Sequence, residues 1–489
     1  MHWFPSASWL RASLVMAFLM GCEGQPPPQQ AVEQPQLQPA EPPVLDPVHI
    51  GEERLRSPLL EGLRQQIENS ETEETREVTQ PLTKQLAAAD AIMSEARSQN
   101  RSSIQQANRQ VRMGAARQSP NFVVITVDRM GVNDLGCYGQ TRWETPALDK
   151  LAANGLRFTQ SYSGLNPTTS QSSLLTADFA AATTSGRATG MLPKVLWNAG
   201  YKTALIGEWS GDSSPAHQGY EESSGWNTAP AEFPDWALLN GNRITLEGNS
   251  RGRRQDSSTD FLVSEVRSFL REARGRPNQF FLHVTIRLFD DVAGRSWNAE
   301  DYAAQIRLAD TTSGRVLDAL DEFGLGNRTC LYFIALAGPH PSLNHLMRET
   351  HSTADFSHSA EGLREGNLRV PFIASWPGQI PAGSVSEVTA GPWDILPTLS
   401  QLAFVSRPLG RVDGRSLVEV LRHNQPLAGR RIVWKSPANG NVLAVREGNW
   451  KAVRVESAND QLFDLNSDRA EQQDVAAEHD DVLRRLLKQ

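Results

Sequence analysis

Four of the ten histidines lie close together in one stretch of the chain. They are His340, His345, His351 and His358. Imidazole nitrogen is a common ligand for zinc, so this cluster could form a transition-metal site. Consecutive histidines are five, six and seven residues apart, which matches none of the usual zinc-ligand spacings. A solvated loop is the alternative, and the spacing favours it.

A second group of chemically capable side chains is basic and consists of Arg243, Arg251, Arg253 and Arg254. Guanidinium groups bind sulfate, phosphate and carboxylate oxygens in a bidentate manner. This stretch could therefore bind a polyanion. An ordinary exposed loop is the alternative, and it is favoured because nothing else in the stretch points to a ligand.

Asp128 follows the first strongly apolar segment of the globular part of the chain. Residues 122–127 read FVVITV, which is typical of a strand buried on both faces. Ligands of α/β proteins bind beyond the carboxyl ends of parallel strands. We therefore expect Asp128 to lie at the functional edge of a sheet.

The elements that would position these residues alternate between strand-like and helix-like segments. Further strands are expected at 156–162, 202–206, 280–286, 330–335 and 371–375, with amphipathic helices at 146–154, 261–270 and 306–320. A Ser/Thr-rich turn should lead into another helix at 170–177. This alternation predicts an α/β domain with a mostly parallel sheet over residues 119–425.

The last residues, 426–489, have a different pattern. Short strand-like runs occur at 431–433, 442–445, 451–455 and 461–465, and a helix is expected at 481–487. Short consecutive runs of this kind favour antiparallel pairing. We expect a small C-terminal α+β subdomain with antiparallel strands.

The N-terminus resembles a bacterial lipoprotein signal peptide over residues 1–21. Arg11 precedes an apolar run that ends in Leu-Met-Gly-Cys at Cys22, which gives the charged, apolar and small-residue order of such a signal. A membrane-spanning helix is the alternative, but the run falls well short of the ~20 residues it needs. We expect a lipid on Cys22 to anchor an extracytoplasmic protein to the membrane at the periplasmic or surface face of the cell envelope.

Two segments should separate the anchor from the globular part. Residues 22–50 form a Pro/Gln-rich tether, expected to be extended and solvated. Residues 51–118 are charged and helix-favouring, and we expect a helical spacer there. A weak oligomerising coiled coil is the alternative, but the apolar positions are too sparse for a sustained heptad pattern.

Composition excludes several classes of protein. The net charge of −8 over 489 residues gives no electrostatic footprint for nucleic acid. Three cysteines exclude a disulfide-built scaffold. The sequence leaves open whether Cys137 and Cys330 pair, and two free thiols are favoured.

Ten segments together resemble the sulfatase family of the alkaline-phosphatase superfamily, in that family's order and spacing. They are NFVVITVDRMGVNDLGCYG (121–139), ETPALD (144–149), GLRF (155–158), SLLT (173–176), GYKT (200–203), GEW (207–209), RVP (369–371), WPG (376–378), DILPT (394–398) and LFDL (462–465). The resemblance covers residues 120–487, about three quarters of the chain. It implies the fold of that family and, by default, sulfate-ester hydrolysis.

The catalytic nucleophile that the resemblance implies is missing. The family uses a Cys or Ser, oxidised to formylglycine, in a C/S-x-P-S-R motif, and the aligned residue is Pro167. The motif's serine and arginine fall on Ser170 and Gln171. A shift of one residue offers Thr168, as in some phosphoester-cleaving relatives, but a threonine hydroxyl needs a base or cation to activate it. A turn or capping hydroxyl is the favoured role for Thr168.

The family's divalent calcium or magnesium ion is bound by two aspartates and an Asp-Asn pair, which are hard oxygen ligands. Here the aligned residues are Asp128 and Arg129, then Leu336 and Ala337. Repulsion of a dication by Arg129 at ~4 Å would be on the order of 8 kcal/mol with an effective dielectric of ~20. These departures from the family's pattern therefore predict no bound cofactor; Ca²⁺ or Mg²⁺ is expected only if the chain is an enzyme.

The groups that hold sulfate in the family have also changed. The lysine and histidine of its G-K-W-H segment are Glu208 and Ser210 here. The histidine expected after the strand at 280–286 is absent from RLFDD, which starts at Arg287, and no lysine precedes REG at 364–366. Because acidic and basic residues exchanged places, we predict that Arg129, Glu208 and Asp128 form an ion-paired plug in the former pocket.

These observations predict a lipid-anchored pseudo-sulfatase with a binding or scaffolding role. A sulfated or phosphorylated glycan is the expected partner, and the resemblance extends that expectation to the arginine-rich loop at 243–254. Two alternatives stay open. One is an active sulfuric-ester or phosphoester hydrolase that uses non-standard groups such as Thr168, and the other is a purely structural envelope protein.

Overall fold

The structure is a computed structural model that describes residues 119–179, 191–209, 214–288, 296–405, 412–435, 442–456 and 458–488. The predicted signal peptide with Cys22, the tether and the helical spacer lie outside these residues, as does Ser210. Within the described part, no helix is both long and apolar enough to cross a membrane.

A ten-stranded sheet forms the centre of the larger domain, in the order β10-β2-β9-β8-β1-β7-β3-β4-β5-β6. Its middle consists of the parallel strands β8 (Thr329–Ala335), β1 (Asn121–Val127), β7 (Phe280–Ile286) and β3 (Lys202–Glu208). Every residue of β1, β7 and β8 is buried. Burial on both faces explains why these strands are continuous apolar runs in the sequence.

The outer strands make the sheet mixed. On one side lie β9 (Phe372–Ser375), β2 (Leu156–Phe158) and β10 (Ser384–Ser386), and β9 is antiparallel to both β8 and β2. On the other side, β4 (Glu222–Trp226) is parallel to β3 and is followed by the antiparallel hairpin of β5 (Trp236–Leu239) and β6 (Asn242–Thr245).

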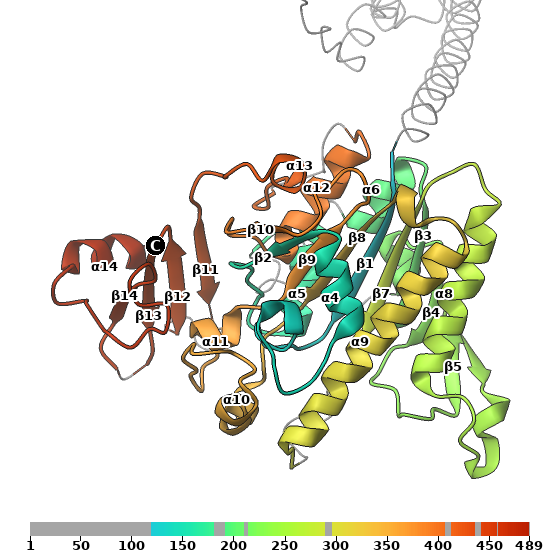
Figure 1. Cartoon of the computed structure of the whole chain (residues 1–489), viewed down its shortest axis with the longest axis horizontal. Helices are drawn as coiled ribbons and strands as arrows, with labels where there is room; N and C mark the ends of the chain where they lie inside the picture. The colour runs from blue at the N-terminus through green and yellow to red at the C-terminus, as the bar shows by residue number, and fades with distance from the viewer. Residues whose placement is uncertain are drawn as a thin grey trace, which may run out of the picture. The chain divides into compact units, whose positions relative to one another are not determined.

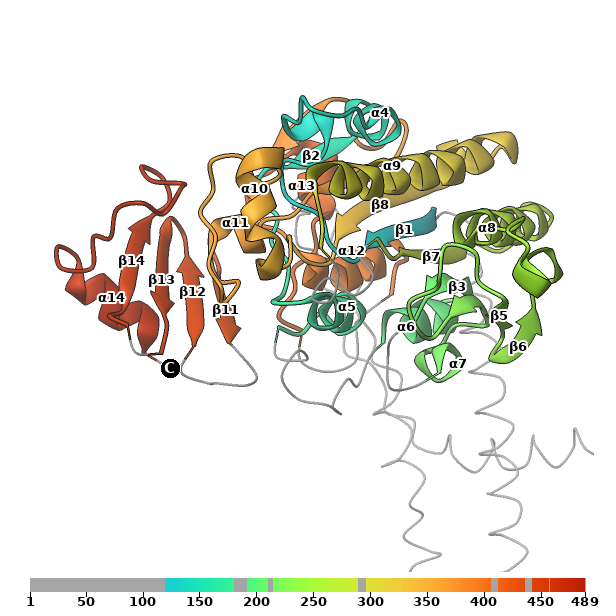
Figure 2. The ribbon, with the colours of Figure 1, turned by 90° about the horizontal axis from the view of Figure 1, so that it is seen from below.

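Helices cover both faces of this sheet (Figure 2). Alternate side chains of β1 belong to different cores: Val123 and Ile125 pack with one set of helices, and Phe122 and Val124 with the other. The first set is α4 (Pro146–Ala153), α8 (Ser258–Arg274) and α9 (Ala299–Glu322); the second is α5 (Pro167–Thr176), α6 (Leu192–Asn198) and α12 (Ile395–Leu402). The two cores follow from the period-two alternation of a strand.

Short helices lie in the connections and near the C-terminus. They are α7 (Pro215–Gln218), α10 (Asn344–Thr350), α11 (Glu365–Leu368), α13 (Val418–His423) and α14 (Asp480–Leu487).

The C-terminal part is a four-stranded antiparallel sheet covered by α14 (Figure 1). Its strands are β11 (Arg431–Lys435), β12 (Leu443–Glu447), β13 (Trp450–Arg454) and β14 (Gln461–Asp464). One face packs Trp434 and Phe463 against Tyr162 and Trp393 of the larger domain. The other face packs against Leu486 and its neighbours in α14.

The α/β fold with a mostly parallel sheet and a small C-terminal antiparallel sheet, predicted from the sequence, is confirmed. Two boundaries next to the candidate site differ from the prediction. Strand β2 ends at Phe158, and α5 begins at Pro167 instead of residue 170. The helix starts earlier because proline suits the first helical position and because Asn166 and Thr169 form a capping box around it.

Candidate active site

Three charged residues meet at the carboxyl edge of the sheet. Asp128 directly follows β1, Glu208 is the last residue of β3, and Arg287 directly follows β7. Strand β7 lies between β1 and β3 in the sheet. The strand order therefore places Arg287 between the two carboxylates.

The contacts of Arg287 are those of a bridging cation. Its Nη1 lies 3.1 Å from Oε1 and 3.3 Å from Oε2 of Glu208, and its Nε lies 3.8 Å from Oδ2 of Asp128. Oδ1 of Asp128 accepts a hydrogen bond of 2.8 Å from the backbone N–H of Leu288. Both carboxylates are only 10% exposed, against 33% for Arg287. We call this group the Asp128–Arg287–Glu208 bridge.

Arg129, the cation that the sequence suggested for this pairing, points elsewhere. Its Nη1 donates a hydrogen bond of 3.3 Å to the carbonyl oxygen of Gly338, in the connection after β8. Burial lowers the pKa of this guanidinium, Asp128 opposes that shift, and Arg287 adds to it. The predicted plug of Arg129 with Glu208 is therefore corrected. Glu208 pairs with Arg287 instead, because β7, which Arg287 follows, lies between β1 and β3 in the sheet.

The first turn of α5 forms another part of this region. Pro167 occupies the first helical position, and Asn166 caps the helix by accepting from the N–H of Thr169 at 2.9 Å. Thr168 is exposed on this turn, and its hydroxyl makes no hydrogen bond within the described residues. Ser170 is buried, and its hydroxyl accepts a 2.7 Å hydrogen bond from the N–H of Gly164.

Comparison with known proteins now identifies the family. The profile of the sulfatase family matches residues 120–405, more than half of the chain. This chain belongs to the sulfatase family. It is 29% identical to rat (Rattus norvegicus) N-acetylgalactosamine-6-sulfatase, over 69% of this chain and 72% of that protein.

Two solved sulfatase-like structures have the same fold. Ps i-CgsB in complex with k-i-k-neocarrahexaose superposes with a TM-score of 0.65 at 21% identity, covering 76% of this chain and 91% of the other. BT4656 in complex with its substrate D-glucosamine-2-N,6-O-disulfate gives a TM-score of 0.58 at 19% identity, covering 76% and 96%. At these identities the likeness establishes the fold.

The residues aligned with the sulfatase cation ligands do not fit a divalent metal ion. Asp128 supplies one carboxylate, which faces Arg287. Leu336 and Ala337, at the aligned second pair, are apolar and buried. Within the described ranges, no group of three His, Cys, Asp or Glu side chains converges as a metal site. A hard dication needs several oxygen ligands, and this edge presents a guanidinium instead.

The resemblance places three further residues in the sulfatase pocket. Gln171 is 8% exposed in α5 next to Ser170. Glu208, where the resemblance implies lysine, pairs with Arg287. Pro167, where the resemblance implies the nucleophile, has a saturated ring with no nucleophilic atom.

The histidine cluster spans the 3₁₀ turn Pro341–Leu343, α10 and the residues that flank them, so the predicted loop is helical in part. Nδ1 of His340 lies 2.8 Å from the hydroxyl of Ser342, and Nδ1 of His345 lies 3.1 Å from the Ser342 carbonyl oxygen. His351 ends α10 in the left-handed conformation with φ of 52°. Nε2 of His358 lies 2.8 Å from the Thr353 hydroxyl, and burial lowers its pKa to about 4. Each histidine that bonds a side chain or carbonyl does so with a near neighbour in sequence.

The arginine-rich stretch is not a plain loop: Arg243 lies in β6, and Arg251 lies in the following 3₁₀ segment, Glu247–Gly252. The guanidinium of Arg243 lies 4.6 Å from the ring centre of Trp236, and that of Arg254 lies 5.9 Å from that of Phe233. Arg253 donates to the carbonyl oxygens of Glu247 and Ser250. All four arginines are exposed, so this surface is basic and partly aromatic.

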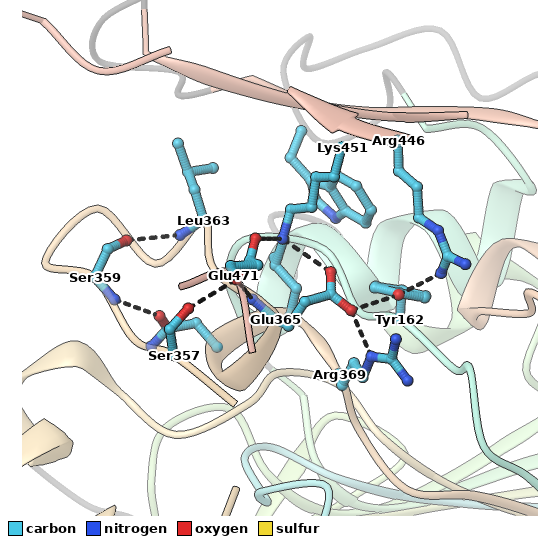
Figure 3. A network of polar contacts seen from close by, with 12 residues as sticks. Tyr162, Ser357, Ser359, Leu363, Glu365, Arg369, Arg446, Lys451 and Glu471 are labelled. Carbon is cyan, nitrogen blue, oxygen red and sulfur yellow. Dashed lines mark hydrogen bonds and ion pairs between the residues drawn. The ribbon is translucent and has the colours of Figure 1, made fainter. Parts of the chain in front are cut away.

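A buried ionic network, which sequence reasoning missed, joins the two sheets (Figure 3). Nζ of Lys451 in β13 lies 2.9 Å from both Glu365 Oε1 and Glu471 Oε1. Glu365 also accepts from Nε of Arg369 at 2.5 Å and from the Tyr162 hydroxyl at 2.7 Å. Burial alone would raise the pKa of Glu365, but Lys451 and Arg369 outweigh burial and lower it below its ordinary range.

The sequence contained only part of the information needed to predict this network. Glu365 and Arg369 lie in the REGNLRVP segment that carries part of the sulfatase resemblance. The partners of Glu365 are distant along the chain: Tyr162 is 203 residues away, Lys451 is 86 and Glu471 is 106. No local pattern connects such distant residues.

Both cysteines of the described part are free thiols. Cys330 lies buried in β8, and burial raises its pKa to about 12. Cys137 lies in the connection after β1, and burial also raises its pKa above the ordinary range. Neither thiol is therefore suited to act as a thiolate nucleophile.

A cavity of about 800 Å³ opens at the opposite edge of the sheet. Its walls include Lys150 of α4, Leu317 and Asp321 of α9, and Thr329 at the start of β8. Because parallel β8 begins here and ends at the Asp128 edge, the cavity is remote from the aligned catalytic residues.

Proposed function

We propose that this sulfatase-family chain binds a sulfated or phosphorylated glycan and does not hydrolyse it. The Asp128–Arg287–Glu208 bridge is the observation that carries the proposal. It puts a cation of the protein's own chain where the family would need a dication and a sulfate-binding lysine. The two carboxylates stabilise the partly buried guanidinium of Arg287 between them. A metal ion could bind there only by displacing that guanidinium.

The missing nucleophile supports the same proposal. Hydrolysis by covalent catalysis needs an activated hydroxyl, thiol or comparable group. Pro167 has none. The hydroxyl of Thr168 is exposed and, within the described residues, has no base within hydrogen-bond distance. The groups that would stabilise charge on a departing sulfate are absent or, where Glu208 replaces the lysine, acidic. Transition-state charge stabilisation is usually the largest catalytic contribution.

Two solved structures with the same fold support a glycan partner. Ps i-CgsB and BT4656 are both in complex with saccharides. The present chain retains the fold and carries exposed arginines that bind no carboxylate in the described structure. Guanidinium groups suit sulfate and phosphate oxygens.

We further propose that a lipid on Cys22 holds the protein at the cell envelope, outside the cytoplasm. The support is the order of Arg11, the apolar run and the small residues before Cys22. The tether and the spacer would hold the binding domain away from the membrane. Mass spectrometry of the mature protein from its native host should find a diacylated Cys22 as the first residue, and a chain that keeps residues 1–21 would refute the anchor.

The competing function is hydrolysis through Thr168. Full-length protein should release no product from an aryl sulfate or an aryl phosphate, with or without added Ca²⁺ and Mg²⁺. The matched comparison is Thr168→Ala, which removes the hydroxyl, against Thr159→Ala, which lies away from α5. Turnover that is lost in Thr168→Ala and kept in Thr159→Ala would establish the hydrolase and refute our proposal.

Glycan binding has its own test. The full-length protein should be retained by a sulfated-polysaccharide column and pass through its unsulfated counterpart, and retention should fall with salt because surface charges are screened. Equal passage through both columns would favour the purely structural alternative.

A further inference from the structure

A cavity of about 420 Å³ lies at the junction of the larger domain and the C-terminal sheet. Its wall includes Gln160 after β2, Glu387 after β10, and Asn449 in the turn between β12 and β13. Three arginines, Arg415, Arg430 and Arg446, also line it. We call it the junction cavity.

Arg446 and Arg415 make no ion pair in the described part of the chain. Arg446 is 4% exposed and donates to the Tyr162 hydroxyl, to Oε1 of Gln160 and to the carbonyl oxygen of Gly448. Glu365 attracts Arg446 electrostatically, but its oxygens bond to Lys451, Arg369 and Tyr162. The half-buried Arg415 donates to the carbonyl oxygen of Ala428 at 2.6 Å. Both cations are therefore held by neutral oxygens.

Arg430, the third arginine, is paired but still has a donor left over. It forms a bidentate pair with the buried Asp394, at 2.7 Å from Nη1 to Oδ1 and 2.5 Å from Nη2 to Oδ2. Its Nε is buried and has no hydrogen-bond partner. A buried donor without a partner is destabilising, and a ligand oxygen could satisfy it.

The charges on the cavity wall are unbalanced. Three arginines line it, and Glu387 is the carboxylate that lines it with them. Asp394 neutralises Arg430. Like charges brought together at low exposure are unfavourable unless an opposite charge joins them. An oxyanion satisfies this arrangement, because each guanidinium presents paired N–H groups that match two oxygens.

We propose that the junction cavity binds an oxyanion group carried by a saccharide. Its volume is within the ~300–1,000 Å³ typical of small-molecule sites. Arg415 and Arg446 hold the sulfate, phosphate or carboxylate group, and polar wall residues such as Gln160 and Asn449 are placed for sugar hydroxyls. A free inorganic oxyanion has the same recognition chemistry, so the experiment separates the two.

The junction cavity is favoured over the arginine-rich loop as the binding site. The loop at residues 243–254 is exposed, and acidic residues Glu232, Asp235, Glu247 and Asp256 lie in the same stretch of sequence. The cavity is concave and contains one lining carboxylate. This inference rests on the proposed function for the choice of a glycan ligand, but its location is independent of whether the chain hydrolyses esters.

The test is calorimetric titration of the full-length protein with N-acetylglucosamine 6-sulfate, N-acetylglucosamine, inorganic sulfate and inorganic phosphate. The sulfated sugar should bind most tightly and the neutral sugar least. Arg415→Gln should weaken the sulfated sugar by about tenfold or more, because it removes a charge-assisted contact. Glu387→Gln should tighten binding several-fold, because it removes the lining negative charge.

Matched controls make the result specific. Arg328→Gln removes an exposed arginine next to β8, at the other edge of the sheet, and should leave affinity unchanged. Unchanged melting temperatures of the variants, measured alongside, show that each chain is folded. Glu387→Gln changes an exposed residue, so it keeps the test decisive even if Arg415→Gln unfolds.

Several results would overturn the inference. If Arg415→Gln and Glu387→Gln both bind the sulfated sugar as tightly as wild type, the junction cavity is not the binding site. Loss of binding in a variant with Arg251, Arg253 and Arg254 all changed to Ala would also exclude the cavity. Inorganic sulfate or phosphate binding as tightly as the sulfated sugar would refute the saccharide ligand. If the polysaccharide column retains the protein and Arg415→Gln has no effect, the proposed glycan-binding function is supported and the junction cavity is refuted as its site. Ester hydrolysis by the protein would refute the proposed function alone.

Discussion

At the scale of single residues, Arg287 decides the chemistry of the carboxyl edge. Its guanidinium lies between the carboxylates of Asp128 and Glu208, each about nine-tenths buried. Two carboxylates this shielded repel each other and lose hydration, so the cation between them stabilises the folded chain. The same cation makes the edge unsuited to a dication.

Arg287→Ala should therefore destabilise the protein. We expect a loss of about 2 kcal/mol in the free energy of unfolding at pH 7.5, less than for a fully buried pair because Arg287 is one-third exposed. The measurement is denaturant unfolding followed by tryptophan fluorescence.

Arg307→Ala is the matched control for this prediction. Arg307 pairs with Glu300 on the surface of α9, with both side chains exposed. Such pairs contribute about 0–1 kcal/mol. Equal losses in the two variants would mean that the bridge has no special role.

At the scale of elements, β7 carries a buried histidine inside the sheet. Nδ1 of His283 lies 2.8 Å from the Tyr220 hydroxyl, and Nε2 lies 3.2 Å from the Thr126 hydroxyl. Burial lowers the pKa of His283 to about 3. The histidine is therefore neutral in the folded protein at every pH where an unfolded chain would begin to charge it.

His283 should make stability depend on pH. Between pH 7.5 and pH 5 the unfolded chain takes up a proton at this residue and the folded chain does not. Stability therefore falls as the pH falls, by about 2 kcal/mol from this group if its unfolded pKa is about 6.5. In His283→Gln, the loss of unfolding free energy between these two pH values should be smaller by that amount.

The comparison for His283→Gln is His345→Gln, which changes an exposed histidine of α10. A wild-type slope in His283→Gln would show that its protonation does not differ between the folded and unfolded states. The comparison does not depend on the absolute stability of the variant, because only the change of unfolding free energy with pH is compared.

The central strands of the large sheet were predictable because strands buried on both faces form continuous apolar runs in the sequence. The runs at 280–286 and 122–127 are continuous apolar strands, and both were placed to within a residue. The start of α5 was placed three residues late, because Pro167 and the polar residues after it resemble a turn until the Asn166 capping box is seen.

The candidate site was predictable only in part. The positions of Asp128 and Glu208 followed from the resemblance, but their shared partner did not. Pairing across strand ends depends on strand order, and the insertion of β7 between β1 and β3 is not visible in any local pattern. The same reason hid the junction cavity, whose arginines come from separate connections and from β12.

At the scale of the whole described molecule, a buried ionic network fastens the C-terminal sheet to the larger domain (Figure 3). Lys451 is fully buried and pairs with Glu365 and Glu471. Glu365 in turn bonds Arg369 and Tyr162 of the larger domain. The junction cavity lies beside this network, and Arg446 contacts Tyr162. Loss of the network should therefore loosen the junction.

Lys451→Met should be strongly destabilising, by about 3–5 kcal/mol, because it leaves two buried carboxylates without their shared cation. The same variant should become sensitive to limited proteolysis in the connection before β11. Lys435→Met, an exposed lysine at the end of β11, is the control and should change stability by less than about 0.5 kcal/mol. Similar unfolding curves for both variants would contradict the proposed role of the network.

We propose that the chain's own Arg287 takes the place of the dication of the sulfatase family. Elemental analysis of the full-length protein, purified without chelators and equilibrated with Ca²⁺ and Mg²⁺ before desalting, tests this proposal. We expect far less than one equivalent of either metal, unchanged in Asp128→Asn. One equivalent of retained metal, lost in Asp128→Asn, would contradict it.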